Sequence, residues 1–411
     1  MKKISVFTPS HDPRFLGDCY QSLLNQTYQD WEWVVLLNGS AEWQPPSDDR
    51  VKTYATDDVL GVGAAKRRAV MLSSGDILVE FDHDDILLPE ALEKVAGVFE
   101  SDPEAVFVYS DFQQINEDGS PNKDRFSTAM GWEYDEDKCI TFPQYPSAVS
   151  YIWFGPNHVR SFTRAAYDAV GGYDENLEVL DDQDLFCRLY QYGKFVGIPE
   201  CLYQQRVHPG NTQVRQDLNL RIQIETVEMY DRFIQPNALA WAEREGLAAI
   251  DLGGAHNSPE GYISFDMHDG ADITCDLTEG IPLPSDSVGV VRASDFLEHI
   301  GDKIEIMNEI WRVLAHGGML LSLTPSSDGR GAYQDPTHVS FYNENSFWYY
   351  TDQNFAKYVP EIKCRFQVSR LTTFFPTEWH KEHDISYVCA NLVAIKEGGP
   401  RLPGMLNWSK D

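Results

Sequence analysis

Residues 81–85, FDHDD, place three carboxylates and an imidazole directly after the apolar run ILVE. Asp82 and Asp84 lie two positions apart at the end of a predicted strand, so both can direct oxygen ligands at one divalent cation. Such a cation could hold a diphosphate and neutralise it as a leaving group. The alternative is a solvated acidic turn. We expect Asp85 to cap the following helix and His83 to point away from the other side chains.

Three further segments carry groups that suit the same chemistry. Lys66, in GAAKRRAV, could contact a phosphate, with a solvated helix face as the alternative. The segment LDDQDLFCRL opens a predicted helix with a second carboxylate group, and an acceptor hydroxyl needs a general base within hydrogen-bond reach. His208, in RVHPGNT, could be a third metal ligand or a plain surface histidine.

The N-terminal region has the elements needed to position these groups. Short β-rich runs alternate with amphipathic stretches, which predicts a mostly parallel sheet covered by helices. Ligands of such sheets bind at the carboxyl ends of the strands. Polar groups follow three of the runs: Thr8-Pro9-Ser10, Asn38-Gly39-Ser40 and Asp82-His83-Asp84. The predicted strands are residues 4–9, 31–37, 77–82 and 106–111.

The middle of the chain is less regular. Residues 112–160 are rich in Asp, Pro and aromatic residues, which is typical of a binding loop or of disorder. A helix is predicted near residues 162–170. Residues 215–246 are predicted to form a helical connector between two domains.

Strand–helix alternation restarts at residue 248. The segment 303–314, KIEIMNEIWRVL, is a clear amphipathic helix. Gly253 and Gly254 form a turn after the strand that holds Asp251, and the next strand ends in Asp266. In nucleoside-binding α/β folds such glycines let the backbone approach the ligand, and the acid binds ribose hydroxyls. The predicted strands are residues 248–254, 262–267, 271–277, 287–294, 317–325, 366–375 and 386–397.

Length and composition limit the class of protein. A chain of 411 residues suggests two or three domains, at roughly 150 residues each. A net charge of −31 disfavours nucleic acids and anionic lipids as partners. No apolar stretch approaches the roughly 18 residues of a transmembrane helix, and the N-terminus is not expected to be a signal peptide. Seven scattered cysteines favour a reducing, cytoplasmic location.

Residues 1–215 resemble the inverting family-2 glycosyltransferases of the GT-A fold. The resemblance rests on four ordered segments: ISVFTPSHDP, LLNQTYQDWEWVVLLNGS, GVGAAKRRAVMLSSGDILVEFDHDD and VGGYDENLEVLDDQDLFCRL. It implies a nucleotide-sugar donor, Mn²⁺ or Mg²⁺, and a glycan or other hydroxyl acceptor.

The resemblance also implies residue roles. Thr8, Pro9, Ser10 and Asn38 would hold the nucleobase and ribose, and Lys66 would approach the diphosphate. Asp82 and Asp84 would bind the cation together with His208, and Asp182 would be the catalytic base. Leu37 and Asn38 stand where the family has two aspartates, so a uridine preference is not implied, and Lys66-Arg67 replaces Arg-Asn.

Residues 248–396 resemble class I S-adenosylmethionine-dependent methyltransferases. The segments are DLGGAHNSPEGYISFD, CDLTEGIPLPSDSV, SDFLEHI, NEIWRVLAHGGML and QDPTHVSFYNENSFWYYT, with Ala255 in place of the motif's last glycine. The resemblance implies S-adenosylmethionine binding. The implied cofactor-binding residues are Asp251, Gly253, Gly254, Asp266 and, near adenine, Asp276. His299 and His338 would lie on the methyl-acceptor side, although His299 could also cap its helix.

The sequence therefore predicts an α/β protein with two catalytic domains. Residues 1–214 would form the GT-A glycosyltransferase, 215–246 the connector and 247–411 a Rossmann-like methyltransferase that methylates the glycan product. One alternative is a degenerate methyltransferase-like binding or assembly module. Another is glycosylation of modified DNA, which the acidic charge disfavours.

Overall fold

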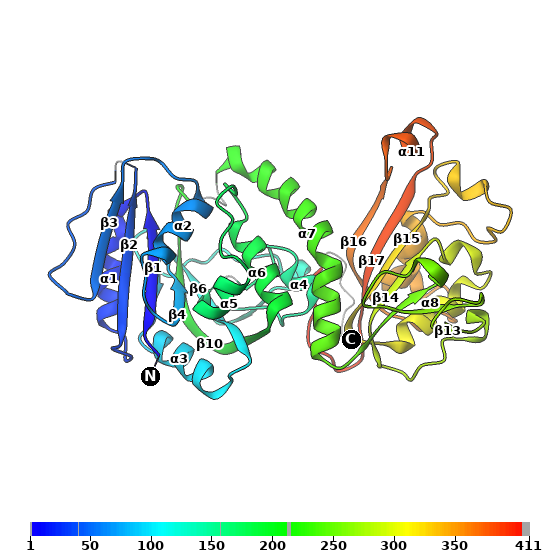
Figure 1. Ribbon diagram of the computed structural model, residues 1–411, viewed down its shortest axis with the longest axis horizontal. Coiled ribbons are helices and arrows are strands. Elements are labelled where there is room, and N and C mark those ends of the chain that lie inside the picture. The colour runs from blue at the N-terminus through cyan, green and yellow to red at the C-terminus, as the bar shows by residue number, and fades with distance from the viewer. Residues whose placement is uncertain (1, 40, 157, 212–214, 405–411) are drawn as a thin grey trace. The chain divides into compact units, whose positions relative to one another are not determined.

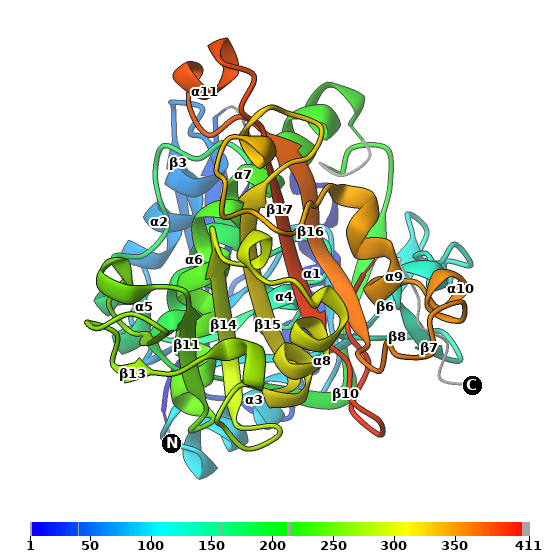
Figure 2. The same cartoon turned by 90° about the vertical axis from the view of Figure 1, so that its right-hand side faces the viewer.

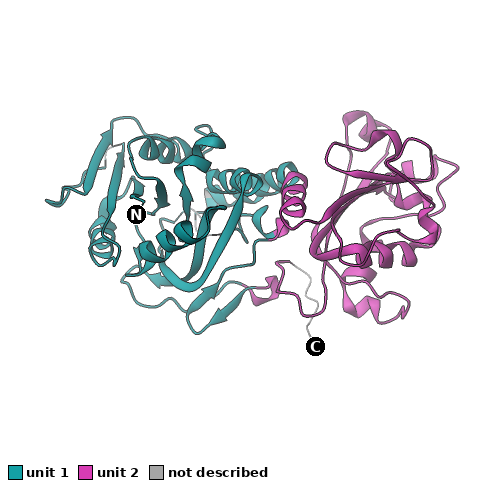
Figure 3. Ribbon diagram, turned by 60° about the horizontal axis from the view of Figure 1, so that its bottom comes forward, with its two compact units in different colours: residues 1–126, 132–144, 148–233 teal, residues 127–131, 145–147, 234–411 magenta. Residues whose placement is uncertain are grey.

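The computed structural model describes residues 2–39, 41–156, 158–211 and 215–404 (Figure 1). The chain divides into two compact units, drawn in teal and magenta in Figure 3. Unit 1 holds residues 1–126, 132–144 and 148–233, and unit 2 holds 127–131, 145–147 and 234–411. The division falls at Phe233 and Ile234, inside helix α7 (Gln216–Arg244), which also contains Pro236.

Unit 1 is an α/β unit whose described strands form one ten-stranded sheet. Its strand order is β3-β2-β1-β4-β9-β6-β10-β5, with β7 and β8 attached at β6. The first four strands are parallel, whereas β9 runs antiparallel to β4 and β6. The strands are β1 (Ile4–Ser10), β2 (Trp31–Asn38), β3 (Val51–Thr56), β4 (Ile77–Glu80), β5 (Ile86–Leu87), β6 (Ala105–Asn116), β7 (Glu133–Asp135), β8 (Lys138–Ile140), β9 (Ser161–Thr163) and β10 (Lys194–Val207).

Apolar strands and amphipathic helices build the core of unit 1. Strands β1, β2 and β4 are buried along almost their whole length, as expected for strands covered by helices on both faces. Helix α3 turns Leu92, Val95 and Phe99 inward at helical spacing. The helices are α1 (Leu16–Leu24), α2 (Val62–Met71), α3 (Ala91–Ser101), α4 (Pro146–Val149), α5 (Arg164–Ala169) and α6 (Asp181–Tyr192); the division between the units falls inside α4, after Ser147.

The segment predicted to be irregular is more ordered than its composition suggests. Strand β6 continues to Asn116, and β7 and β8 form a short antiparallel hairpin that pairs with β6. The sequence prediction also missed β3, β9 and β10, which carry too many polar residues for a clear apolar pattern.

Unit 2 is a second α/β unit, with seven described strands in the order β13-β12-β11-β14-β15-β17-β16 (Figure 2). The first five strands in this order, β13, β12, β11, β14 and β15, are parallel to one another. Strand β17 runs antiparallel to both β15 and β16. Six of the seven fall within predicted segments, whereas β15 begins three residues before its predicted segment, at Leu314, which was expected to end the preceding helix. They are β11 (Ala248–Leu252), β12 (Ile263–Asp266), β13 (Ile273–Thr274), β14 (Val288–Ser294), β15 (Leu314–Pro325), β16 (Phe366–Phe374) and β17 (Tyr387–Ala394).

The helices of unit 2 are mostly short. Helix α8 (Lys303–Val313) is the predicted amphipathic helix and buries Met307 and Ile310 in the core of the unit. The described helical structure between β11 and β12 is limited to the 3₁₀ turn Ala255–Asn257. The other helices are α9 (Trp348–Thr351), α10 (Gln353–Ala356) and α11 (Glu378–Glu382). Within the described ranges, no helix is both long and apolar enough to cross a membrane.

Candidate functional site

The three polar strand ends of unit 1 meet at one edge of the sheet. Strand β1 pairs in parallel with β2 and with β4, so their carboxyl ends lie side by side. Thr8 is buried and accepts a hydrogen bond from the indole of Trp33 at 2.9 Å. The hydroxyl oxygen of Ser10 is buried and has no hydrogen-bond partner among the described residues. Ser10 thus retains hydrogen-bonding capacity at the end of the strand.

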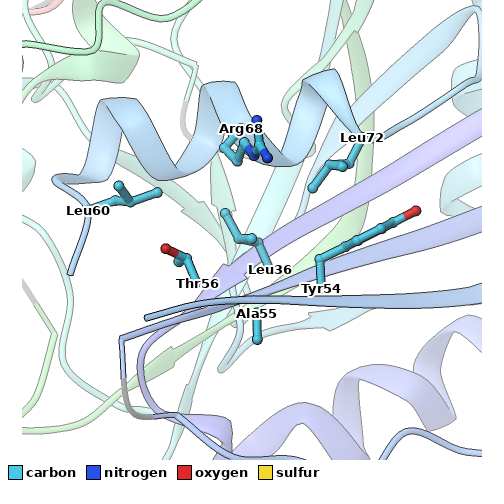
Figure 4. Close-up of a pocket in the computed structure, with 7 residues that line it drawn as sticks. All are labelled: Leu36, Tyr54, Ala55, Thr56, Leu60, Arg68 and Leu72. Atoms are coloured by element: carbon cyan, nitrogen blue, oxygen red, sulfur yellow. The ribbon is translucent and has the colours of Figure 1, made fainter. Parts of the chain in front are cut away.

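Asn38, at the end of β2, is engaged with the loop before α2. Its amide nitrogen donates to the carbonyl of Leu60, and its amide oxygen accepts from the backbone N–H of Leu60, both at 2.9 Å. Leu60 also lines a pocket of about 410 Å³ between β2, β3 and α2 (Figure 4). The remaining lining residues are Leu36, Tyr54, Ala55, Thr56, Arg68 and Leu72.

A buried network of ion pairs joins Glu80, at the end of β4, to Lys66 of α2 and Asp181 of α6. The Lys66 ammonium is 2.8 Å from Glu80 and 2.7 Å from Asp181, and only 7% of its side chain is exposed. Burial opposes ionisation of Glu80, but Arg160 and Lys66 lower the pKa of Glu80 to about 2. Burial raises the pKa of Asp181 to about 6, against the opposing effect of Lys66. Lys66 therefore sits between two acids in this structure.

Arg160 connects two of the predicted site residues. Its guanidinium lies 3.1 Å from Asp82 and 3.3 Å from Asp182, and its Nη1 also donates to Glu80 at 2.7 Å. The side chains of Asp82 and Asp182 are 36% and 23% exposed, so both can be reached from solvent. In the structure, Asp82 and the predicted base Asp182 therefore contact the same guanidinium group, that of Arg160.

Asp84 and His208 also lie together. The Nε2 atom of His208 is 2.9 Å from a carboxylate oxygen of Asp84, which also accepts from the amide of Asn211 at 3.1 Å. Arg206 donates to the backbone carbonyl of Asp84 at 2.7 Å. Two of the three predicted metal ligands are therefore in direct contact.

The prediction that Asp85 caps a helix is wrong. Asp85 is buried and accepts from the hydroxyl of Tyr203 at 2.8 Å and from the backbone N–H of Arg206 at 2.7 Å. Helix α3 begins only at Ala91. Burial, together with the neighbouring Asp84 and Asp82, raises the pKa of Asp85 well above its usual range. Its role is to tie the FDHDD segment to β10.

The donor set of unit 1 suits a divalent cation. In the part of the chain that the structure describes, ligand atoms of Asp82, Asp85 and His158 lie within 4.8 Å of one another. His158 is buried, and neither ring nitrogen has a hydrogen-bond partner among the described residues. Carboxylate oxygens and imidazole nitrogens are common ligands of Mn²⁺. The predicted trio of Asp82, Asp84 and His208 does not lie within the same distance.

Sequence reasoning missed Glu80 and Arg160. Glu80 ends an otherwise apolar strand, so its charge was an available signal of a buried partner. Arg160 lies in the irregular stretch before the short strand β9, and nothing local marks it. Only the antiparallel pairing of β9 with β4 brings it beside the acids.

In unit 2 the glycine turn after β11 is tightly enclosed. Gly253 has a φ of +75°, and a Cβ atom there would lie 2.8 Å from the ring of Phe296. A Cβ atom on Gly254 would lie 2.3 Å from the carboxylate of Asp251, which is buried and paired with Arg292 at 2.8 Å. Ala255, at the position where the resembling family has glycine, has a φ of +37°. Phe296 and the Asp251 carboxylate therefore leave no space for a side chain at Gly253 or Gly254.

Asp266 and Asp276 both contact local backbone. Asp266 ends β12, is buried, and accepts from the N–H of His268 at 2.9 Å. Asp276 accepts from the N–H and the hydroxyl of Thr278 and so caps a 3₁₀ turn, Leu277–Glu279. Asp276 also lines a pocket of about 710 Å³ whose wall includes Glu305, Glu309 and Arg312.

His299 and His338 lie together. Their ring centroids are 4.9 Å apart, in an edge-to-face arrangement. His299 does not cap helix α8, because Asp302 is the N-cap and accepts from the N–H groups of Ile304 and Glu305.

Comparison with known proteins agrees with both resemblances. The model of the family "Glycosyl transferase family 2" matches residues 5–169, and that of the family "Methyltransferase domain" matches residues 250–322. The chondroitin synthases of Pasteurella multocida (strain Pm70) and Escherichia coli are each 26% identical, over 221 and 220 residues. The match covers 52% of this chain but only 21% and 30% of the synthases, so this chain spans less than a third of their length.

Two further similar proteins extend this comparison. The O-antigen biosynthesis glycosyltransferase WbnJ of Escherichia coli is 25% identical over 230 residues, covering 51% of this chain and 82% of its own. The crystal structure of S. aureus TarS 1–349 in complex with UDP has a TM-score of 0.43 and 16% identity, covering 59% and 71% of the two chains. The chain carries a family 2 glycosyltransferase domain in its N-terminal half and a methyltransferase domain in its C-terminal half.

Proposed function

We propose that unit 1 is an inverting, metal-dependent glycosyltransferase that moves a sugar from a nucleotide-sugar donor to a glycan hydroxyl. The observation that carries this proposal is the shared contact of Asp82 and Asp182 with Arg160. Asp82 belongs to the segment proposed to bind the cation, and Asp182 is the acid proposed to abstract the proton. Both carboxylates contact the guanidinium of Arg160. Both acids retain exposed surface at the carboxyl edge of the sheet.

In this proposal Asp182 acts as the general base. Its Oδ1 accepts from the backbone N–H of Gln183 at 2.9 Å, and its Oδ2 faces Arg160, so the carboxylate is held in place. Asp182 takes the proton of the acceptor hydroxyl as that oxygen bonds to the anomeric carbon. The bond from this carbon to the nucleotide diphosphate breaks on the opposite face, which inverts the configuration.

The divalent cation would be held by Asp82 and Asp84, with His208 beside Asp84, and the alternative ligand set is Asp82, Asp85 and His158, whose ligand atoms lie closer together. When bound, it neutralises the charge of the departing diphosphate. Thr8, Pro9, Ser10 and Asn38 are proposed to contact the nucleoside part of the donor, with Lys66 on the diphosphate side. Because Lys66 is balanced by Glu80 and Asp181, the attraction for the diphosphate must come largely from the cation.

Unit 2 is proposed to methylate the glycan product with S-adenosylmethionine, which supplies an electrophilic methyl group when bound. The glycine turn directly after β11 supports this proposal, because in nucleoside-binding α/β folds the backbone approaches the ligand at such a turn. Asp251, Asp266 and Asp276 are the proposed polar contacts, and His299 and His338 would face the acceptor. A tandem arrangement raises the local concentration of the second site.

The names of the similar proteins favour a glycan acceptor. The similar synthases make chondroitin, and WbnJ acts in O-antigen biosynthesis. We further propose a cytoplasmic location, supported by the scattered cysteines, and no nucleic-acid substrate, supported by the net charge of −31.

Glycosyl transfer is tested with Asp182→Asn. A screen of nucleotide-sugar hydrolysis with Mn²⁺ first identifies the donor without requiring the acceptor. The variant should then lose about 10²- to 10⁴-fold in kcat, because the acceptor proton has no base, while KM for the donor changes little. Methyl transfer by unit 2 should be unaffected when the product of unit 1, made by the wild-type chain, is supplied. A variant that keeps more than a tenth of the wild-type kcat would exclude Asp182 as the base.

Methyl transfer is tested by calorimetric titration of the full chain with S-adenosylmethionine. Binding, followed by release of S-adenosylhomocysteine when the product of unit 1 is added, supports the proposal. Lack of binding at millimolar cofactor would instead favour the binding-module alternative.

A further inference from the structure

A second cluster of metal-binding side chains lies in unit 2. Ligand atoms of Glu298, His299 and His338 lie within 4.8 Å of one another. Glu298 and His299 adjoin each other after β14, whereas His338 lies on a loop about 40 residues later in the chain. Two imidazoles and one carboxylate form a common ligand set for Zn²⁺, Co²⁺, Mn²⁺ and Fe²⁺.

Glu298 is the buried residue of this cluster, and one of its two carboxylate oxygens has no hydrogen-bond partner among the described residues. The residue is only 2% exposed. Its Oε2 accepts from the hydroxyl of Thr324 at 2.6 Å, whereas its Oε1 has no hydrogen-bond partner in the described part of the chain. A buried carboxylate oxygen without a partner is costly unless a cation or a donor satisfies it. The two histidines are the neighbouring groups through which a shared cation could do so.

The two histidines are arranged as metal ligands usually are. The Nδ1 atom of His338 is 2.8 Å from the carbonyl of Ala332, and the Nδ1 atom of His299 is 3.4 Å from the carbonyl of Thr337. A carbonyl can only accept, so the hydrogen of His338 belongs on Nδ1. The nearer partner of the His299 Nδ1 is the hydroxyl of Thr337 at 3.2 Å, and because that hydroxyl donates to Asp335 at 2.6 Å, the hydrogen between them belongs on Nδ1 as well. This tautomer leaves the lone pair of Nε2 available to a metal.

The loop that carries His338 is fixed to the segment that carries Glu298. The backbone N–H groups of Val339 and Ser340 both donate to the carbonyl of Glu298 at 2.9 Å. The hydroxyl of Ser340 donates to the carbonyl of Ile300 at 2.6 Å. The three ligands therefore come from backbone segments that are bonded to each other, which preorganises the cluster.

We propose that Glu298, His299 and His338 bind a divalent transition-metal ion. Three protein ligands leave coordination positions open, and His299 is exposed, so the ion can take an oxygen ligand such as a hydroxyl of the methyl acceptor. The site is distinct from the proposed cation site of unit 1. It adds to the proposed methyl transfer, but metal binding itself does not depend on that reaction.

The test is a titration of the tag-free, metal-stripped full chain with Co²⁺, followed by visible absorption and calorimetry. Asp82→Asn and Asp84→Asn are introduced together first, to weaken the site of unit 1. This chain should still bind one Co²⁺ ion, and adding His338→Gln or His299→Gln should weaken that binding at least tenfold. The control His380→Gln changes a half-buried histidine of α11 that is not part of the cluster, and it should leave Co²⁺ affinity unchanged.

Two results would overturn the proposal. One is the absence of Co²⁺ binding when both aspartates of unit 1 are replaced. The other is unchanged affinity in both histidine variants. Because His299 is exposed and His338 half-buried, these variants should fold even if Glu298→Gln does not. S-adenosylmethionine binding, measured in the same samples, separates failure of the metal site from failure of the proposed methyltransferase.

Discussion

The two units gather their candidate ligand-binding residues in different ways. In unit 1 the acids at the strand ends are already matched with cations of the protein, chiefly Lys66 and Arg160. In unit 2 the central feature is a turn from which side chains are excluded, at Gly253 and Gly254. Unit 1 is thus organised by charge and unit 2 by shape. Changes in charge should therefore damage the first unit, and changes in volume the second.

The sharpest test of this contrast is Lys66→Met. Removing the ammonium leaves Glu80 and Asp181 buried without it, and loss of one member of a buried ion pair costs about 3–5 kcal/mol. Hydrogen exchange resolved by peptide should report this loss in α2 and α6, but not in unit 2.

The matched control for Lys66→Met is Lys94→Met. Lys94 pairs with Glu200 at 2.9 Å on the surface of the same unit. Exposed pairs contribute only about 0–1 kcal/mol, so this variant should be near wild type. Equal effects of the two substitutions would contradict the view that charge organises the interior of unit 1.

The acid stability of unit 1 gives a second test. Glu80 has a folded-state pKa of about 2, below its ordinary value of 4.5. Its contribution to stability is therefore complete above pH 4.5 and is lost as the pH falls through about 2. The free energy of unfolding of unit 1 should fall more steeply over this window in the wild type than in Glu80→Gln. Parallel curves for the two proteins would show that Glu80 is not held as a carboxylate.

The smallest expected effect tests the shape of unit 2. Gly254→Ala adds a Cβ atom 2.3 Å from the Asp251 carboxylate, and overpacking of this kind costs roughly 1–3 kcal/mol. Calorimetry should also show weaker S-adenosylmethionine binding. Gly97→Ala is the control, because α3 has open space there and the exchange should stabilise the helix by about 0.5–1 kcal/mol. Wild-type cofactor affinity in Gly254→Ala would remove the turn from the proposed site.

The sequence predicted the parts of the molecule that local patterns encode. Apolar runs marked β1, β2 and β4, and the polar groups after them lie at one edge because parallel neighbours share an orientation. The contact of Arg160 with Asp82 and Asp182 depends on a strand pairing between distant segments, which no local pattern reveals. The helix-cap prediction for Asp85 is wrong for the same reason. The hydrogen-bond partner of Asp85, Tyr203, lies more than a hundred residues away in the sequence, so no local pattern reveals it.

Asn38, at the end of β2, is hydrogen-bonded to Leu60 in the loop before α2, so the two positions cannot be redesigned independently. Its amide both donates to and accepts from Leu60, and an aspartate could only accept. Restoring an acid at this position would therefore leave the carbonyl of Leu60 without its donor and loosen the loop before α2. Any attempt to transplant the donor preference of another glycosyltransferase onto this chain must exchange the residue and that loop as one cassette.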